Sequence, residues 1–314
     1  MKKIIFAIFK IIYIALSHTW LRYVPGMLEI SNKIFRAVYP DKNFVELNNH
    51  LKMAININEK NPGLRYTFQA YALNLIHEEE TTRLFKDIVR PNDTVLDLGA
   101  NIGYFSLMAG KLVGANGKVF SFEPDLKNYE YLTKNIKLNK LTNIVTFNKA
   151  VSNKNGKEKF YFCSYDSGHH TLKQPLGIEA YAKGRSYKEN YKIVETVAID
   201  SFLAQYKIDV DIIKIDVEGA EALAFQGMRK TLSKPNIKIF MEYFPLLIKK
   251  MGNHPESMFI ELIDIYHFNA YVIPDDYDMT KNTKLFKLNN YLELEKLIVK
   301  EDSHVNLFLT KDSI

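Results

Sequence analysis

From Thr94 onward the chain alternates short apolar segments with helical stretches, and this alternation constrains the fold more than any other feature. Five runs rich in Val, Ile and Phe are candidate strands: TVLDL (94–98), KVFSF (118–122), NIVTFNKAV (143–151), VDIIKID (210–216) and IKIFMEY (237–243). Helical stretches such as NYEYLTKNIKLN lie between several of them. This alternation is typical of a doubly wound parallel sheet. The sequence therefore predicts an α/β fold.

Length and composition define the class of protein. The chain has 314 residues, more than a usual core of roughly 100–200 residues, so we expect one large domain with insertions or one domain with an appendage. Hydrophobic residues make up 47% of it, enough to bury a sizeable core. The single cysteine, Cys163, excludes an intrachain disulfide framework and a multi-cysteine zinc site. The net charge of +6 is modest and does not predict a nucleic-acid partner.

The N-terminal region differs from the rest of the chain. Residues 1–77 are expected to form a mainly helical extension, and residues 78–314 the α/β domain. Within that domain, residues 152–197 interrupt the alternation with the segments KEKFYF and YKIVETV, which predict two extra strands around a long loop. An insertion of this length inside an α/β unit is more often functional than idle.

An apolar segment, IIFAIFKIIYIAL, occupies residues 4–16. As a helix it would rise about 20 Å, short of the ~30 Å hydrocarbon core of a bilayer, so a spanning helix is not expected. Lys3, Lys10 and Ser17 would form one narrow polar stripe, which suits either a membrane interface or burial against the domain. A signal peptide is a further interpretation, but Lys10 interrupts its apolar core. We expect residues 1–17 to make a peripheral membrane contact or to pack within the protein.

A glycine-containing turn follows the first predicted strand, at the place where an open α/β sheet binds its ligand. In VLDLGANIGYF this turn holds Asp97, Gly99, Asn101 and Gly103. Gly99 and Gly103 permit a tight turn and a close approach of the backbone to a ligand. The spacing departs from G-x-G-x-x-G, and Asp97 would repel a pyrophosphate but attract the ammonium of an amino-acid moiety. The turn therefore argues against a dinucleotide.

The second predicted strand is followed by an acid, Glu123, 24 residues beyond Gly99. An acid at this position can accept hydrogen bonds from ribose hydroxyls. A nicotinamide dinucleotide and S-adenosylmethionine would both use such an acid, so the pattern by itself leaves both cofactors open. A glycine-lined turn with a purely structural role is the third interpretation, and the position of Glu123 argues against it.

Four sequence blocks occur in the order DTVLDLGANIGYFS, GKVFSFEPDLKNYEYLTKNIKLN, NKAVSNKNG and DIIKIDVEGAEALAFQGM, the last followed by a strand that ends in MEYFP. Together they resemble the FkbM-type family of S-adenosylmethionine-dependent methyltransferases. The resemblance covers roughly residues 78–245, and KIDVEGAE is its most specific part. It implies a class I methyltransferase fold, which is a doubly wound, mostly parallel sheet with an antiparallel last strand.

The resemblance also implies S-adenosylmethionine as cofactor. Carried over by position, the implied cofactor residues are Asp97, Gly99, Ala100, Asn101, Gly103, Glu123, Pro124, Ala150, Val151 and Asp216. The glycine turn would hold the methionine part, Glu123 the ribose, and Ala150 and Val151 would pass near the adenine. Members of the family commonly methylate hydroxyls of sugars, glycolipids or natural products. The implied partner is a small-molecule or glycan acceptor, and the implied location is the cytoplasm, where the donor is made.

Three charged residues in DIIKIDVEGAE are candidates for the chemistry. Strand alternation places Lys214, Asp216 and Glu218 toward one side, with Asp216 near the ligand-binding end. Methyl transfer to an alcohol needs in-line approach and a base that removes the hydroxyl proton. Asp216 and Glu218 are the best candidates for this side of the site, and Lys214 would hold one of them by charge pairing. The alternative is an ion-paired strand end that only supports the turn.

Other candidates lie outside that segment. His169 and His170 occur in the long insertion, where one of them would serve as general base or both belong to a solvated turn. Glu242 lies in the fifth predicted strand, near its end, and would complete an acidic ring with Asp216 and Glu218. Such a ring can bind a divalent ion that acidifies a hydroxyl, so metal-assisted and general-base mechanisms both stay open and no metal ligand is assigned.

Two other functional classes are alternatives to a methyltransferase. A nicotinamide-dependent oxidoreductase would need a phosphate-compatible glycine turn in place of Asp97-Leu98-Gly99. A non-catalytic cofactor-binding module is disfavoured because Gly99, Glu123 and Asp216 are intact. Nitrogen also stays open as the methylated atom, although DVEG replaces the N/D-P-P-Y-type turn that marks amide methylation.

Overall fold

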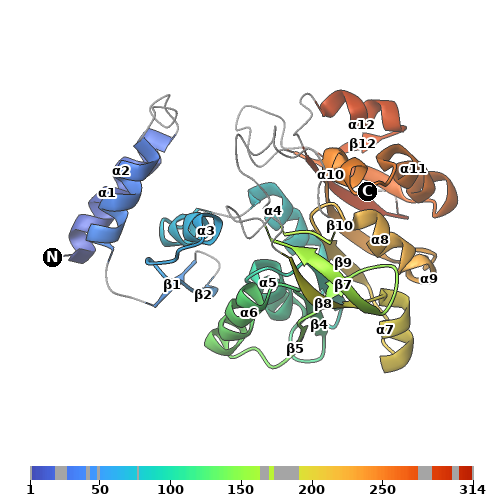
Figure 1. Cartoon of the computed structure of the whole chain (residues 1–314), viewed down its shortest axis with the longest axis horizontal. Coiled ribbons are helices and arrows are strands. Elements are labelled where there is room, and N and C mark those ends of the chain that lie inside the picture. Colours follow the sequence, from blue (N-terminus) through green and yellow to red (C-terminus); the bar gives the residue numbers. More distant parts are fainter. Residues whose placement is uncertain are drawn as a thin grey trace. The chain divides into compact units, whose positions relative to one another are not determined.

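The computed structural model describes residues 2–17, 27–39, 43–47, 50–75, 78–162, 170–172, 191–274, 285–298 and 304–312. Contacts divide the chain into two compact units, Met1–Ile76 and His77–Ile314 (Figure 1). Among the described residues, no helix is both long enough and apolar enough to cross a membrane.

The described part of the first unit contains α1 (Lys2–Ser17), α2 (Met27–Val38), β1 (Phe44–Glu46), β2 (Lys52–Ala54) and α3 (Pro62–Ala72). Aromatic rings of α1 pack on those of α2, and β1 pairs antiparallel with β2. The helix α3 begins after Asn61, whose side chain accepts a hydrogen bond from the Leu64 N–H and so caps the helix. Apart from the β1–β2 hairpin, the described extension is helical, as predicted.

The second unit is built on an eight-stranded sheet. Its strands are β3 (Thr94–Leu98), β4 (Lys118–Phe122), β5 (Ile144–Phe147), β9 (Ile212–Ile215), β10 (Lys238–Tyr243), β11 (Asn269–Ile273), β12 (Phe286–Leu288) and β13 (Val305–Thr310). They lie in the order β12-β11-β13-β10-β9-β3-β4-β5. The strands from β10 to β5 are parallel, whereas β13 lies between β10 and β11 and is antiparallel to both. The predicted fold, with its antiparallel last strand, is confirmed.

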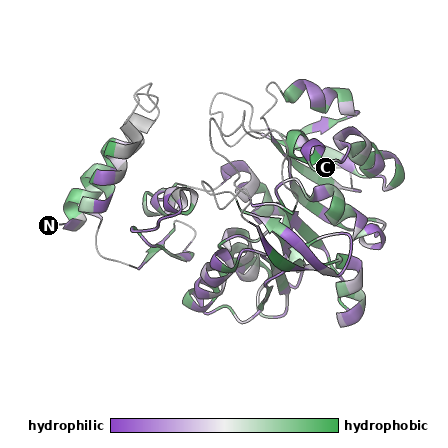
Figure 2. Cartoon of the chain, viewed as in Figure 1, coloured by the Kyte–Doolittle hydropathy of each residue, from purple (hydrophilic) through white to green (hydrophobic). Residues whose placement is uncertain are grey.

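Helices cover both faces of this sheet. Their bounds are α4 (Glu79–Ile88), α5 (Tyr104–Val113), α6 (Leu126–Asn139), α7 (Ile199–Tyr206), α8 (Glu221–Gln226), α9 (Arg229–Leu232), α10 (Pro245–Lys250), α11 (Pro255–Ile260), a π-helical turn (Glu261–Ile265) and α12 (Tyr291–Leu297). Alternation along β10 shows the two faces: Ile239 and Met241 join the large core cluster, while Phe240 meets Phe85 of α4 with ring centroids 5.1 Å apart. Hydrophobic residues follow the central strands in Figure 2.

The third predicted strand, 143–151, is divided in the structure. Its first half is β5, and its end is β6 (Ala150–Val151), which joins a separate three-stranded sheet with β8 (Tyr191–Val197) and β7 (Gly156–Tyr161). The break lies at Asn148, whose side-chain amide donates to the carbonyl oxygens of Glu123 and Pro124 at 2.8 and 3.1 Å. The two extra strands expected in the insertion are present as β7 and β8.

Candidate functional site

A cleft partly open to solvent lies where β3, β4 and β9 end. This is the edge at which open α/β sheets bind ligands. The predicted residues that line it are Gly99, Asn101, Glu123, Pro124, Ala150, Val151, His170, Asp216 and Glu218. Residues from five separate parts of the sequence thus meet in one cavity.

The glycine turn after β3 ties three strand ends together. The N–H groups of Gly99 and Ala100 both donate to the carbonyl of Phe122 at 2.9 Å. Gly99 has φ +85°, and a Cβ there would lie 1.7 Å from the carbonyl oxygen of Asp216. Only glycine therefore fits at position 99, because of both the backbone conformation and the lack of space for a side chain.

Glu123 is buried at the edge of the cleft and held by two backbone groups. The Asn101 N–H donates to one carboxylate oxygen and the Asp125 N–H to the other, each at 2.8 Å. Burial raises the pKa of Glu123 to about 8, against the lowering effect of these hydrogen bonds. Each carboxylate oxygen keeps lone-pair capacity for a further donor, so the group is oriented to accept hydrogen bonds from a ligand hydroxyl.

Asp97 is buried and does not line the cleft. Its carboxylate accepts a hydrogen bond from the hydroxyl of Ser106 on α5, which also contacts the hydroxyl of Ser121. Burial raises the pKa of Asp97 to about 6. The carboxylate of Asp97 is thus already hydrogen-bonded within the protein. The contact with a ligand ammonium group that the sequence suggests for Asp97 stays a prediction.

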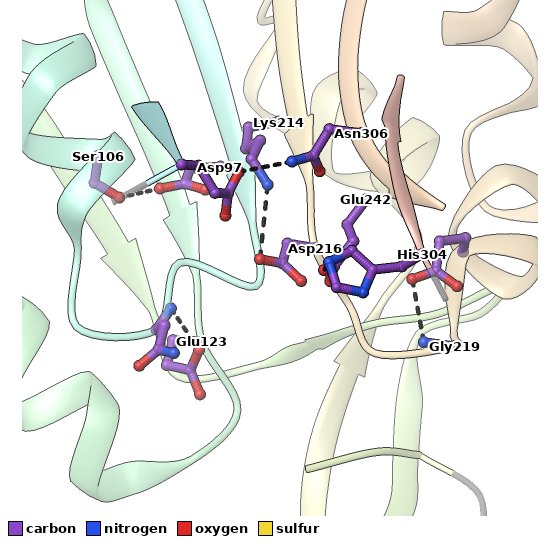
Figure 3. A network of polar contacts seen from close by, with 12 residues as sticks. Asp97, Ser106, Glu123, Lys214, Asp216, Gly219, Glu242, His304 and Asn306 are labelled. Atoms are coloured by element: carbon purple, nitrogen blue, oxygen red, sulfur yellow. Dashed lines mark hydrogen bonds and ion pairs between the residues drawn. The ribbon is translucent and has the colours of Figure 1, made fainter. Parts of the chain in front are cut away.

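A chain of charged side chains runs from β9 to β13 beside the cleft (Figure 3). The Nζ of Lys214 lies 3.6 Å from Oδ2 of Asp216, and Nε2 of His304 lies 3.2 Å from Oε1 of Glu242. Asn306 donates to Oε2 of Glu78 at 3.5 Å. Lys214 is almost completely buried and also lies over the ring of Phe105.

The carboxylates around Lys214 keep this lysine charged. Burial alone would lower the pKa of Lys214, but the surrounding carboxylates of Glu78, Asp216, Glu242 and Asp97 raise it above its usual value. Lys214 therefore acts as a permanent cation that anchors Asp216, which corresponds to its predicted pairing role. That role is structural in kind, because Lys214 does not line the cleft.

Asp216, Glu218 and Glu242 form a carboxylate cluster, in which each residue offers an oxygen within 4.8 Å of the others. Burial, followed by the charges of Asp216 and Glu78, raises the pKa of Glu242 well above its usual range. The protonated form of Glu242 is therefore favoured beside the carboxylate of Asp216.

The turn after β9 presents one member of this cluster to the cleft. Glu218 has φ +52°, and Gly219, which follows it, has φ +93°. A left-handed conformation is unfavourable for a residue with a side chain and is found preferentially at functional sites. The Gly219 N–H donates to Glu221 at 3.1 Å, which closes the turn at the start of α8.

Of the two predicted histidines, the structure describes only one. His169 lies outside the described residues. His170 lines the cleft and packs edge-on against Phe160 and Phe162, with ring centroids 5.9 and 4.7 Å away. In the described part of the chain it does not belong to the carboxylate cluster. Its role as general base stays a prediction.

The family model of the methyltransferase FkbM domain matches residues 97–273, more than half of the chain. The chain belongs to the FkbM methyltransferase family. The matched domain is an S-adenosylmethionine-dependent methyltransferase domain, and the cleft residues fit that cofactor: a carboxylate for ribose hydroxyls, a glycine turn, and an apolar wall that includes Ala150 and Val151. Family membership decides against the nicotinamide alternative.

Curated relatives of this FkbM methyltransferase are distant. The hexuronic acid methyltransferase AglP of Haloferax volcanii is 23% identical over 163 residues, which span 52% of this chain and 61% of that relative. The methyltransferase sdnD of Sordaria araneosa is 27% identical over 186 residues, or 52% of this chain and 71% of its own length. A crystal structure of an FkbM methyltransferase from Methylobacillus flagellatus aligns with TM-score 0.40 and 14% identity, covering 78% of this chain and 53% of that one.

Sequence reasoning missed three residues of the FkbM site: Glu78, His304 and Asn306. They come together because β13 pairs antiparallel with β10, with Glu242 opposite Asn306. The family match ends at residue 273, before β13, so it does not cover His304 or Asn306. The signal available in the sequence was the pattern HVN at the start of the last apolar run, which carries polar groups to the strand beside Glu242.

The buried carboxyls predict an unusual dependence of stability on pH. Burial raises the pKa values of Asp97, Glu221 and Glu123 to about 6, 7 and 8, whereas all three ionise near 4 in the unfolded chain. The folded state therefore binds more protons between about pH 4 and 8, so the free energy of unfolding falls as the pH rises, by up to about 1.4 kcal/mol per pH unit for each retained proton.

Urea unfolding at pH 6, 7 and 8 tests this expectation. The unfolding midpoint should be highest at pH 6, and Glu221→Gln, at a buried position outside the cleft, should flatten the dependence. A midpoint that rises toward pH 8 would contradict the assigned pKa directions.

Proposed function

We propose that this methyltransferase acts on a hydroxyl of a saccharide, glycolipid or related small-molecule acceptor. The observation that carries the proposal is the carboxylate cluster of Asp216, Glu218 and Glu242 beside the cofactor cleft. An alcohol has a high pKa, so its methylation needs a nearby base, whereas a neutral amine does not. The hexuronic acid methyltransferase among the relatives supports a sugar-type acceptor.

The cofactor would be held by the residues that line the cleft. The turn at 99–101 is proposed for the methionine part, Glu123 for the ribose hydroxyls, and Ala150 and Val151 for the adenine. Bound S-adenosylmethionine supplies an electrophilic methyl group on a sulfonium. The protein's own contribution is to orient the acceptor and to remove its proton.

Asp216 is the proposed proton acceptor, because it both lines the cleft and belongs to the cluster. Lys214 holds one of its oxygens, and burial and the charge of Asp216 raise the pKa of the neighbouring Glu242 well above its usual range. His304, in contact with Glu242, would pass the accepted proton on toward solvent.

A divalent cation on the three carboxylates is the competing mechanism. The ammonium of Lys214, 3.6 Å from Asp216, opposes it, since a second cation there would be repelled by the first. We therefore propose general-base catalysis without a metal. We also propose that the enzyme works in the cytoplasm, where its donor is made.

The test is methyl transfer from methyl-labelled S-adenosylmethionine to a panel of neutral hexoses, hexuronic acids, glycolipids and primary amines, with and without EDTA. We expect label in a sugar ether, which resists mild alkali, and no effect of EDTA. Label in an alkali-labile ester would move the target to a carboxylate, and label only in amines would contradict the proposal. Loss of turnover in EDTA, restored by Mg²⁺, would replace general-base with metal-assisted catalysis.

A further inference from the structure

One face of α1 exposes a row of isoleucines. Ile4, Ile5, Ile8, Ile11 and Ile12, the isoleucine stripe, are between 42% and 70% exposed. The last four follow Ile4 by one, four, seven and eight residues, which places all five on one side of the helix. Two more exposed isoleucines, Ile30 and Ile34, lie on α2, and hydrophobic colouring recurs along both helices in Figure 2.

The other face of α1 already has a partner. The ring centroid of Phe6 lies 5.9 Å from that of Phe35 on α2 and 5.1 Å from that of Tyr39, the residue after α2, and the ring centroid of Phe9 lies 6.4 Å from that of Phe35. The sequence predicted either a membrane interface or burial for this segment. In the structure α2 covers only the aromatic face of α1. The isoleucine stripe requires a separate explanation, because contiguous exposed apolar surface marks a site of interaction.

The charge around the stripe selects the kind of partner. The helix α1 contains Lys2, Lys3 and Lys10 and no acidic residue, and α2 exposes Lys33 and Arg36. Residues 1–60 hold nine Lys and Arg against four Asp and Glu. A second copy of the same face would bring like charges together, whereas an anionic lipid surface matches both the charge and the apolar row.

We propose that the α1–α2 hairpin binds the surface of a membrane that contains anionic lipids, with the isoleucine stripe inserted at the boundary of headgroups and acyl chains. The 16 residues of α1 are fewer than the ~20 that span a bilayer, so the helix lies along the interface. This inference goes beyond the proposed function and does not depend on it.

The test is co-flotation of the full chain with vesicles of phosphatidylcholine alone or with about 30% phosphatidylglycerol, which supplies an anionic surface. We expect flotation only with the anionic vesicles and weaker flotation at high salt. The double variant Ile8→Gln/Ile11→Gln should lose about tenfold or more of the binding. The matched control, Ile193→Gln/Ile265→Gln, removes two isoleucines that are 59% and 64% exposed in the second unit and should bind as wild type.

Three results would overturn the proposal. The first is absence of wild-type flotation, or equal flotation of the stripe variant. The second is a wild-type dimer by light scattering that the stripe variant lacks, because a second copy would then cover the stripe. The third is a lowered melting temperature in the stripe variant without vesicles, because the stripe would then be covered within the chain. The circular dichroism spectrum serves as a separate check of folding and should be the same in the stripe variant and the wild type.

Discussion

Replacing Asp216 with asparagine is expected to lower kcat by roughly 10²–10⁴-fold, the usual contribution of a general base. Asparagine keeps the size of the side chain but cannot take a proton, and it removes the ion pair that Asp216 forms with Lys214 at 3.6 Å. The measurement is single-turnover methyl transfer under saturating S-adenosylmethionine, beside the affinity for S-adenosylhomocysteine. The control Asp209→Asn, at an exposed site on the protein surface, should retain full activity.

The pH profile tests the contribution of Glu242. In the wild type the rate should rise with pH as Glu242, whose pKa is raised by burial and by the charge of Asp216, loses its proton. In Glu242→Gln that ionisation is absent, so the rising limb of the profile should be lost. If Asp216→Asn kept its kcat and only weakened S-adenosylhomocysteine binding, Asp216 would serve the cofactor and the base would lie elsewhere.

The second large effect is expected at the glycine turn. Gly99→Ala should destabilise the protein by more than about 4 kcal/mol, the range reserved for severe structural conflicts. The added Cβ would overlap the carbonyl oxygen of Asp216 at 1.7 Å, and backbone atoms on two strand ends cannot move apart cheaply. The same overlap would displace Asp216 and Glu123, so any folded fraction should also lose cofactor binding.

A matched glycine separates crowding from backbone strain. Gly114 also has a positive φ, +70°, but nothing lies within 4 Å of a Cβ added there. Gly114→Ala should therefore cost only the strain of about 1–3 kcal/mol. Equilibrium urea unfolding of the two variants measures the difference. Equal losses would show that the turn at Gly99 is less crowded than described.

The features predicted from sequence are those that local pattern determines. Strands β3, β4, β9 and β10 fall where short Val/Ile-rich runs occur, because buried parallel strands are apolar on both faces. The glycine turn and Glu123 were identified for the same reason, since each directly follows a strand and so reaches the ligand-binding edge.

The features that sequence did not predict depend on tertiary pairing. His304 reaches Glu242 only through the antiparallel register of β13 on β10, which no local pattern encodes. The apolar run 143–151 looks continuous, yet Asn148 interrupts it by bonding to the β4–α6 turn. The engagement of Asp97 by Ser106 likewise depends on how α5 packs against β3.

The central claim is that this cleft binds S-adenosylmethionine through Glu123, and calorimetric titration with S-adenosylhomocysteine tests it most directly. Wild type and the exposed control Glu130→Ala should bind with equal affinity, while Glu123→Ala should bind about 10–100-fold more weakly, the loss expected for the hydrogen bonds of two ribose hydroxyls. A folded wild type that does not bind S-adenosylhomocysteine, or a Glu123→Ala variant that binds it equally well, would contradict the account.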